Sequence, residues 1–290
     1  MSRAAVALFT ALAVVLPVTT LAAEPLEVVW HPARLALGGV GWVHVKAISD
    51  TAAVEGAVAG RPLRFFPYAG GQAAVVGVDV ETRPGASSWR IAVVEPGRIP
   101  RTAAGRFVID RRQFSVQRLT LPRAMVELDP AMERRAALER EALVTLYRTI
   151  TPARLWRGPF TRPVAAAEPP TGFGARRILN GRPRAPHTAV DYTAPAGTPV
   201  VAANSGRVAM VADFFFLGRL VVLDHGLGLY TLYSHLDSAA VGIGDRVDRG
   251  QTIGAVGATG RATGPHLHWG VQLGGARLDP LALLDLPISD

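Results

Sequence analysis

The sequence predicts a mainly β protein: an antiparallel β-sandwich, one linker helix, and a C-terminal hybrid of β-sheet and barrel. Short apolar segments alternate with glycine and proline turns in both halves of the chain, and one stretch near the middle has helical signals. The length of 290 residues suffices for two modest domains. A composition of 49% hydrophobic and 19% charged residues argues against extensive disorder.

Residues 1–23 have the order of a secretory signal peptide. Arg3 precedes an apolar stretch at 4–16, which is followed by Pro17 and by small residues ending at Ala23. A membrane anchor is the alternative, but the stretch is shorter than the roughly 20 residues that span a bilayer. We therefore predict cleavage near Ala23, no stable membrane anchor, and a periplasmic or secreted protein.

Residues 24–118 are predicted to form the β-sandwich. Apolar segments are separated there by paired glycines and by Pro-Gly turns, with no helical period between them. The expected strands cover 26–30, 42–48, 63–66, 73–80, 89–94 and 107–116. His31 and His44 lie near these strands without carboxylates at ligand spacing, which predicts a structural role for both.

Residues 119–169 are expected to form a helical and proline-rich linker. Asp129 can cap a helix and Pro130 suits its first position, so we expect a helix that continues over 133–147. Five prolines between positions 152 and 170 then predict an extended segment. The helix is expected to act as a spacer or a brace between domains.

Residues 170–290 are again predicted to be rich in strands. The expected strands cover 199–203, 206–212, 220–223, 229–233, 252–256 and 268–273. The sequence Asp-His-Gly-Leu-Gly at 224–228 predicts the turn of a hairpin between two of them. His225 lies at this turn, and we expect it to be structural.

The charge and cysteine content limit the classes of partner and site. The formal net charge is +8, and Lys46 is the only lysine. A basic surface favours polyanionic partners, but no basic run is interleaved with aromatic residues, so nucleic acid is not an expected partner. The chain has no cysteine, so any metal site must use histidine, aspartate and glutamate.

Five side chains in the last region have spacings that could gather them in one pocket. His187 and Asp191 are four residues apart, His266 and His268 are two apart, and His235 follows a Tyr-Ser pair. On an extended chain, residues two or four apart point to the same face. A catalytic zinc site uses three imidazole or carboxylate ligands and keeps a position for water. These residues therefore predict a metal site with additional histidines for proton transfer.

The same region resembles the lysostaphin-like, or LytM-type, zinc metalloendopeptidases of bacterial cell walls, over about residues 170–285. The matching motifs are Phe-Gly at 173–174 with Arg-Arg at 176–177, His-Thr-Ala-Val-Asp-Tyr at 187–192, Ala-Pro-Ala-Gly-Thr-Pro-Val at 194–200, Tyr-Ser-His-Leu at 233–236, and Gly-Pro-His-Leu-His-Trp-Gly at 264–270. The resemblance implies one Zn2+ held by His187, Asp191 and His268. It also implies that His235 and His266 are the catalytic pair, and that residues 24–118 form an accessory domain.

The resemblance implies an endopeptidase that hydrolyses the peptide cross-links of peptidoglycan. Its implied partners are the peptide stems of peptidoglycan and their cross-links. A D-alanyl–diaminopimelate cross-link and a glycine bridge both stay open as the bond that is cleaved. Ala189 stands where the family usually has glycine, and no tyrosine maps to the position that supports the oxyanion in some members. These two departures affect the expected catalytic efficiency and substrate specificity. They remove none of the expected zinc ligands. The accessory domain could bind glycan, dock a partner or cover the groove.

Two other functions are alternatives to this one. A non-catalytic domain that binds peptidoglycan or activates another wall hydrolase is the main alternative, although such relatives typically lack ligands that this chain keeps. A biotinyl or lipoyl carrier is suggested by the glycine-rich stretch 241–254. That chemistry needs a lysine at a hairpin tip, and Lys46 lies in another region.

Two features near the motifs have open interpretations. The phenylalanines at 214–216 could line a substrate groove or pack between hairpins. Arg176, Arg177 and Arg184 could attract anionic peptide stems or glycan, or they could be ordinary solvated side chains.

Overall fold

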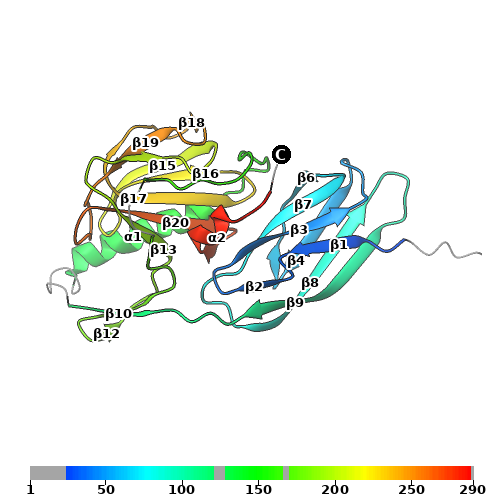
Figure 1. The fold of residues 1–290 in the computed structure, drawn as a ribbon, viewed down its shortest axis with the longest axis horizontal. Helices are drawn as coiled ribbons and strands as arrows, with labels where there is room; N and C mark the ends of the chain where they lie inside the picture. Colours follow the sequence, from blue (N-terminus) through cyan, green and yellow to red (C-terminus); the bar gives the residue numbers. More distant parts are fainter. Residues whose placement is uncertain (1–23, 121–127, 166–169, 289–290) are drawn as a thin grey trace, which may run out of the picture.

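The computed structural model describes residues 24–120, 128–165 and 170–288. These residues form an N-terminal β-sandwich and a larger C-terminal lobe that lie side by side (Figure 1). Strands dominate both lobes, and the described residues contain two helices. The predicted mainly β fold class is therefore confirmed. The predicted signal peptide at 1–23 lies outside the described residues.

The N-terminal lobe consists of two facing sheets. The first sheet has the strand order β1-β3-β7-β6 and comprises β1 (Glu27–His31), β3 (Val40–Lys46), β6 (Phe65–Tyr68) and β7 (Gly71–Gly77). The second has the order β2-β9-β8-β4-β5 and comprises β2 (Arg34–Ala36), β4 (Ala53–Val58), β5 (Arg61–Pro62), β8 (Gly85–Val94) and β9 (Arg101–Asp110). Neighbouring strands are antiparallel, except that β2 and β9 are parallel.

Alternating apolar residues of the two sheets fill the sandwich core. Val43 and Val45 of β3 and Ile91 and Val93 of β8 are buried in one cluster with Phe107 of β9. Residues two apart on a strand share a face, so each strand contributes pairs of this kind. Burial of one such side chain contributes about 1.5–3 kcal/mol, which makes this alternation the main stabilising feature of the lobe.

The two histidines of this lobe have structural contacts. The Nε2 atom of His44 donates a hydrogen bond to the carbonyl oxygen of Tyr68 at 3.1 Å. The ring of His31 stacks on Trp42, with ring centroids 4.2 Å apart. Both contacts fit the structural roles that the sequence predicts.

Several predicted strands differ from the structure in their bounds, and two differences have a clear physical reason. A strand over 107–116 is wrong, because β9 ends at Asp110 and β10 (Val116–Leu119) belongs to another sheet. There β10 pairs in parallel with β11 (Arg176–Leu179). The prediction also omits β4, because its sequence Ala-Val-Glu-Gly-Ala-Val has few of the β-branched and aromatic residues that mark a strand. Pairing with β8 forms this strand in spite of its weak propensity.

Helix α1 (Pro130–Arg148) starts where the sequence predicts. The side chain of Asp129 accepts hydrogen bonds from the backbone N–H groups of Ala131 and Met132 and so caps the helix. The helix lies against the C-terminal lobe (Figure 1). Its packing residues are Leu143, Leu146 and Tyr147. It is thus a brace on that lobe. No helix among the described residues is long and apolar enough to cross a membrane.

The C-terminal lobe is built on a nine-stranded sheet with the main order β13-β20-β17-β16-β15-β18. Its strands are β13 (Ala189–Thr193), β14 (Pro199–Val201), β15 (Gly206–Phe214), β16 (Gly218–Asp224), β17 (Leu229–Ala239), β18 (Arg246–Val247), β19 (Thr252–Val256), β20 (His266–Leu273) and β21 (Ala276–Leu278). Strand β17 pairs with β16 and β20 over its first part and with β19 from Leu236 onward, which curves the sheet towards a barrel. At its edge, β10, β11 and β12 (Arg182–Pro183) form a small separate sheet, and α2 (Pro280–Leu284) follows β21.

The predicted hairpin turn at 224–228 joins β16 to β17. Gly226 has φ of 85°, in the left-handed region that glycine adopts readily. His225 is fully buried in this turn. Its Nδ1 donates to the carbonyl oxygen of Ser205 at 2.8 Å, and its Nε2 accepts from the Thr231 hydroxyl at 2.7 Å. These contacts fit the predicted structural role of His225.

The proline-rich segment after α1 contains no helix or strand in its described part, as predicted, but it is not an exposed linker. Trp156, Phe160 and Val164 are buried in the core of the C-terminal lobe. The same buried cluster includes Trp42 and Phe66 of the sandwich. The two lobes therefore share apolar surface that neither would bury alone.

Candidate metal and catalytic site

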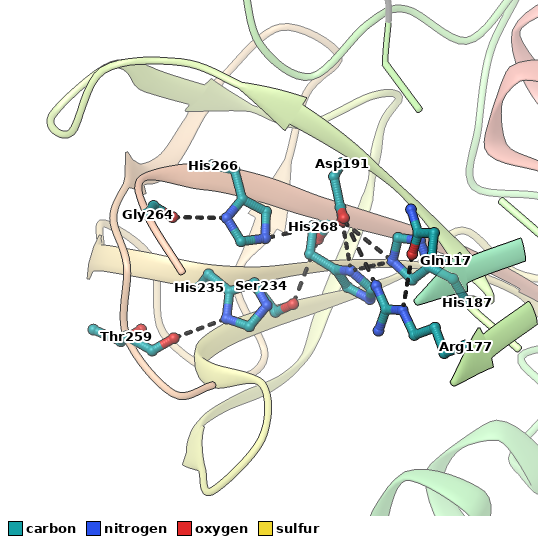
Figure 2. Close-up of polar contacts among 10 residues, drawn as sticks. All are labelled: Gln117, Arg177, His187, Asp191, Ser234, His235, Thr259, Gly264, His266 and His268. Atoms are coloured by element: carbon teal, nitrogen blue, oxygen red, sulfur yellow. Dashed lines mark hydrogen bonds and ion pairs between the residues drawn. The ribbon is translucent and has the colours of Figure 1, made fainter. Parts of the chain in front are cut away.

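Three adjacent strands of the C-terminal lobe bring the predicted site residues to one pocket. Strands β13 and β20 pair Asp191 with His268, and strands β20 and β17 pair His268 with Ser234. His266 lies two residues before His268 on β20 and points to the same side of the sheet (Figure 2). Antiparallel pairing thus joins residues that are separated by 77 positions in the chain.

Three side-chain atoms converge at the centre of this pocket. The Nε2 atom of His187 lies 2.9 Å from Nδ1 of His268 and 3.2 Å from Oδ1 of Asp191. Nδ1 of His268 lies 2.9 Å from the same carboxylate oxygen (Figure 2). Among the described residues, these three form the one cluster of histidine and acidic side chains that could hold a metal ion. Two imidazoles and one carboxylate are a ligand set that zinc accepts.

His187 reaches the pocket from the loop that precedes β13. Its backbone N–H donates to the carbonyl oxygen of Ala175 at 2.9 Å, and its carbonyl oxygen accepts from the N–H of Gly174 at 2.7 Å. Gly172 leaves room for the ring, because a Cβ atom there would lie 2.4 Å from Nδ1 of His187. The His187 side chain is only 1% exposed, so this loop holds it in one orientation.

His235 enters the pocket through an irregular part of β17. Its φ is 60°, in a region that residues other than glycine rarely adopt. The pairing of β17 shifts register on both of its sides here, as in a β-bulge. On a regular strand Ser234 and His235 would face opposite sides. Here the His235 ring centroid lies 4.7 Å from that of His266 and 5.6 Å from that of His268.

In both His235 and His266, Nδ1 donates a hydrogen bond to a backbone carbonyl oxygen. Nδ1 of His235 donates to the carbonyl oxygen of Thr259 at 2.8 Å, and Nδ1 of His266 donates to that of Gly264 at 2.8 Å. A carbonyl oxygen can only accept, so Nδ1 carries the proton and Nε2 has the lone pair in each neutral ring. Nε2 of His266 lies 3.9 Å from Oδ1 of Asp191. In its neutral form each ring therefore has an unprotonated Nε2 that can accept a proton.

The pocket favours the protonation states that metal ligands require. Burial raises the pKa of the Asp191 carboxyl, but hydrogen bonds and charge interactions with His187 and His268 outweigh burial and bring this pKa below its ordinary value. Burial lowers the pKa of His268. Burial and the neighbouring His268 lower the pKa of His235 to about 4. At neutral pH, Asp191 is thus ionised and these imidazoles are neutral, as metal binding needs.

Arg177 places a positive charge at the edge of the cluster. Its Nη2 atom lies 3.9 Å from Oδ2 of Asp191, and its Nε donates to the Gln117 side chain at 3.4 Å (Figure 2). Gln117 is not among the site residues that the sequence predicts. No local signal marks it, because its position depends on the parallel pairing of β10 with β11, which sets it beside Arg177.

Ala189 is accommodated at the position where the related family usually has glycine. The residue is buried and pairs with Gly270 of β20. Its methyl group lies 3.7 Å from the point that a Cβ atom of Gly270 would occupy, which is an ordinary contact distance. The glycine on the partner strand therefore leaves room for the alanine methyl.

The phenylalanines at 214–216 differ in their contacts. Phe214 packs against the cluster that includes α1 residues. Phe215 and Phe216 contact each other with ring centroids 4.9 Å apart. The guanidinium carbon of Arg261 lies 4.1 Å from the centre of the Phe216 ring. Phe214 is thus a packing residue, whereas Phe216 supports an arginine on the loop that holds His235.

Sequence comparisons match the region that contains this site. The model of Peptidase family M23 matches residues 185–280. Peptidoglycan DD-endopeptidase ShyC of Vibrio cholerae serotype O1 is 41% identical over 112 residues, which are 38% of this chain and 26% of ShyC. DD-carboxypeptidase/endopeptidase Mpg of Neisseria meningitidis serogroup B is 40% identical over 97 residues, 33% of this chain and 22% of Mpg. The chain thus matches about a quarter of the length of these relatives.

A crystal structure of a candidate peptidase M23 from Pseudomonas aeruginosa is similar over most of the chain. The TM-score is 0.65 at 29% sequence identity, and the match covers 86% of this chain and 94% of that one. The similarity in fold therefore extends into the N-terminal lobe. Taken with the ordered motifs and the sequence match around the pocket, it makes the C-terminal region of this chain a LytM-type domain of peptidase family M23.

Proposed function

We propose that this protein is a zinc-dependent endopeptidase that hydrolyses peptide cross-links of peptidoglycan. The observation that supports this most is the convergence of ligand atoms from His187, Asp191 and His268 to within 3.2 Å of one another. His235 and His266 lie beside that cluster. All five side chains that the reaction would need are present, which favours catalysis over a role in binding alone.

The ligand set fits a catalytic zinc site. His187, Asp191 and His268 would hold the ion, and three protein ligands leave a position for solvent or substrate. Zinc bound there would supply a Lewis acid that polarises a peptide carbonyl and makes water more acidic. The protonation states of Asp191 and His268 derived above suit this role without rearrangement.

His235 and His266 are proposed to move protons during the reaction. With a pKa of about 4, His235 is neutral at pH 7, and its Nε2 can accept a proton from the attacking water. Once Nε2 of His266 has taken up a proton, such as the one that the attacking water loses, it can stabilise the developing oxyanion or protonate the leaving amine. The bonds from Nδ1 to Thr259 and Gly264 keep both rings oriented for this. Positioned groups of this kind typically contribute about 10²–10⁴-fold to the rate.

The proposed substrate and location draw on the relatives. ShyC and Mpg are named as peptidoglycan DD-endopeptidase and DD-carboxypeptidase/endopeptidase, and peptidoglycan lies outside the cytoplasm. With the predicted signal peptide, this supports a periplasmic enzyme whose partners are peptidoglycan peptide stems. We also propose the division into an accessory domain at 24–118, a connecting segment at 119–169 and a peptidase domain at 170–290.

Digestion of purified peptidoglycan tests the proposal. The protein is incubated with sacculi, newly freed amines are measured, and mass spectrometry of the fragments identifies the cleaved bond. We expect amine release that stops after removal of metal with a chelator and returns with one equivalent of Zn2+. Activity that survives thorough chelation would reject the role of zinc. Protein that is fully loaded with zinc and cleaves nothing would favour the non-catalytic alternative.

A further inference from the structure

Three arginines, Arg177, Arg184 and Arg261, form a cluster at the border of the candidate site. Arg177 lies on β11 and Arg184 follows β12, and the backbone N–H of Arg184 donates to the carbonyl oxygen of Arg177 at 2.8 Å. Burial lowers the pKa of Arg261, and the positive charges of Arg177 and Arg184 lower it further. The positive charges of Arg177 and Arg184 thus reach the guanidinium group of Arg261. Like charges gathered in this way favour an anionic ligand.

The charge of Arg177 is only partly compensated by its contacts. Its side chain is 28% exposed, and its distance of 3.9 Å to Asp191 is too long for a hydrogen bond. The Asp191 carboxylate is already engaged by His187 and His268. The bond to the neutral Gln117 uses Nε alone, and a guanidinium group has five N–H donors. Arg177 thus keeps donors for a further ligand directly beside the metal-binding cluster.

Arg261 lies on the loop that supports His235. Its backbone N–H donates to the carbonyl oxygen of Phe216 at 3.0 Å. Its guanidinium group lies over the Phe216 ring at 4.1 Å, a cation–π contact that keeps the planar group in place. Two residues earlier, Thr259 accepts the hydrogen bond from His235. The same loop therefore positions both a proposed catalytic ring and a positive charge.

We propose that Arg177 and Arg261 form a subsite that binds a free carboxylate of the substrate peptide, close to the bond that is cleaved. The inference rests on the proposed function and specifies its substrate class. The fork of an arginine matches a carboxylate in two parallel hydrogen bonds. Because Nη2 of Arg177 lies 3.9 Å from a carboxylate oxygen of the cluster, a carboxylate of the reacting peptide itself is the anion that fits this position.

Matched peptide substrates test this subsite. Two cross-linked peptides are identical except that one has free carboxylates near the scissile bond and the other has primary amides. The constants kcat and KM are measured for the wild type, Arg177→Gln, Arg261→Gln and the control Arg176→Gln. Arg176 is exposed, and as the neighbour of Arg177 on β11 it points to the opposite face. The control thus removes the same charge outside the subsite.

We expect the wild type to prefer the free acid by about tenfold in kcat/KM, mainly through KM, because a hydrogen bond to a charged group contributes at least this much binding free energy, about 1.4 kcal/mol. Arg177→Gln and Arg261→Gln should each reduce this preference to about threefold or less, and Arg176→Gln should keep it. A wild type without preference, or variants with an unchanged preference, would overturn the proposal. Equal losses on both substrates would also overturn it, because they indicate a purely structural role.

Binding without turnover separates this inference from the proposed function. The affinity of both peptides is measured on protein freed of metal with a chelator, where neither hydrolysis nor zinc contributes. A preference for the acid that the two glutamine variants lose would support the subsite even if no peptide is ever cleaved. Peptidoglycan cleavage with equal affinity for acid and amide would reject the subsite alone. Competition by a soluble phosphodiester polymer as strong as that by the peptide acid would also reject it.

Discussion

His235 has a left-handed backbone conformation that turns its ring towards the other histidines of the site. A left-handed conformation costs of order 1–3 kcal/mol at a residue other than glycine. The fold holds it with two hydrogen bonds, from the backbone N–H to the carbonyl oxygen of Leu217 at 2.9 Å and from the ring to Thr259. Such strain is common where a side chain must face a reacting group, and here it turns the ring towards His266 and His268.

Substitution should separate the proposed proton-transfer residue from a proposed ligand. We expect His235→Ala to keep one equivalent of zinc and to lose about 10²–10⁴-fold in kcat. His268→Ala should lose most of its zinc and its activity together. Metal analysis and peptidoglycan digestion measure both effects, with His31→Ala in the N-terminal lobe as the control. A His235→Ala protein that loses zinc but keeps its activity per metal would contradict this assignment.

Gly172 is expected to be needed for the metal-binding orientation of His187. In Gly172→Ala the new methyl group would meet Nδ1 of His187 at 2.4 Å and displace the ring. Zinc affinity should fall by about 10–100-fold, the range seen when a ligand loses its support. Gly181→Ala is the matched control, because Gly181 also has a positive φ, of 78°, with no atom within 4 Å. Equal affinity of both variants in competition with a chelator would refute the steric argument.

His225 should make stability depend on pH. Burial lowers its pKa from 6.5 to about 4, so between these values the unfolded chain binds a proton that the folded chain excludes. The contribution of neutral, buried His225 to the free energy of unfolding is complete above pH 6.5. It is lost as the pH falls towards 4, and the total loss is up to about 3 kcal/mol. Denaturant unfolding at pH 7 and pH 5, with a chelator present, should show a smaller decrease for His225→Gln than for the wild type. An identical decrease in both would count against this linkage.

At the scale of elements, α1 is fixed to the C-terminal lobe by a few specific contacts. Glu139 accepts a hydrogen bond from the backbone N–H of Phe215 at 2.8 Å and another from Arg135 at 2.6 Å. Arg135 also donates to the carbonyl oxygen of Asp213 at 3.1 Å. The helix therefore supports the end of β15. This end lies next to Phe216, whose ring contacts the guanidinium group of Arg261.

Loss of the Glu139 carboxylate should loosen this support. Glu139→Ala leaves the Phe215 N–H without its partner, and we expect the free energy of unfolding to fall by about 1–3 kcal/mol. Glu139→Gln should lose less, because its amide oxygen still accepts the bond. Glu141→Ala, on an exposed position of the same helix, should change stability by about 0.5 kcal/mol or less. Equal unfolding midpoints for the Glu139→Ala and Glu141→Ala proteins would show that the brace contributes nothing.

At the scale of the whole molecule, the lobes are joined by charge pairs as well as by apolar packing. Arg277 of β21 donates to Asp79 at 2.7 and 2.9 Å and to Glu81 at 2.7 Å. Burial raises the pKa of Asp79, and its bonds with Arg277 bring that pKa below the ordinary value. Arg112 and Asp279 form another pair across the junction at 2.8 Å. Together with the shared core, these contacts predict that the lobes unfold as one unit.

Arg277→Gln should weaken this junction. The substitution leaves the buried Asp79 without its charged partner, so we expect a loss of about 2–3 kcal/mol and a broader or divided calorimetric transition. Arg98→Gln removes an exposed guanidinium group 3.7 Å from Glu95, which keeps its closer partner Arg101 at 2.6 Å, and should cost less than about 1 kcal/mol. A single transition at the wild-type temperature for Arg277→Gln would show that apolar packing alone joins the lobes.

The sequence by itself determined the class of fold, the start of α1, the hairpin at 224–228 and the residue types of the site. These depend on local properties: strand alternation, helix capping, turn-forming residues and the chemistry of imidazole and carboxylate groups. The tertiary structure alone decided the approach of His187 to His268 across 81 residues, the turn of His235 into the pocket, and the place of Gln117 beside Arg177. Strand register, backbone strain and burial depend on contacts between distant residues, which no local pattern specifies.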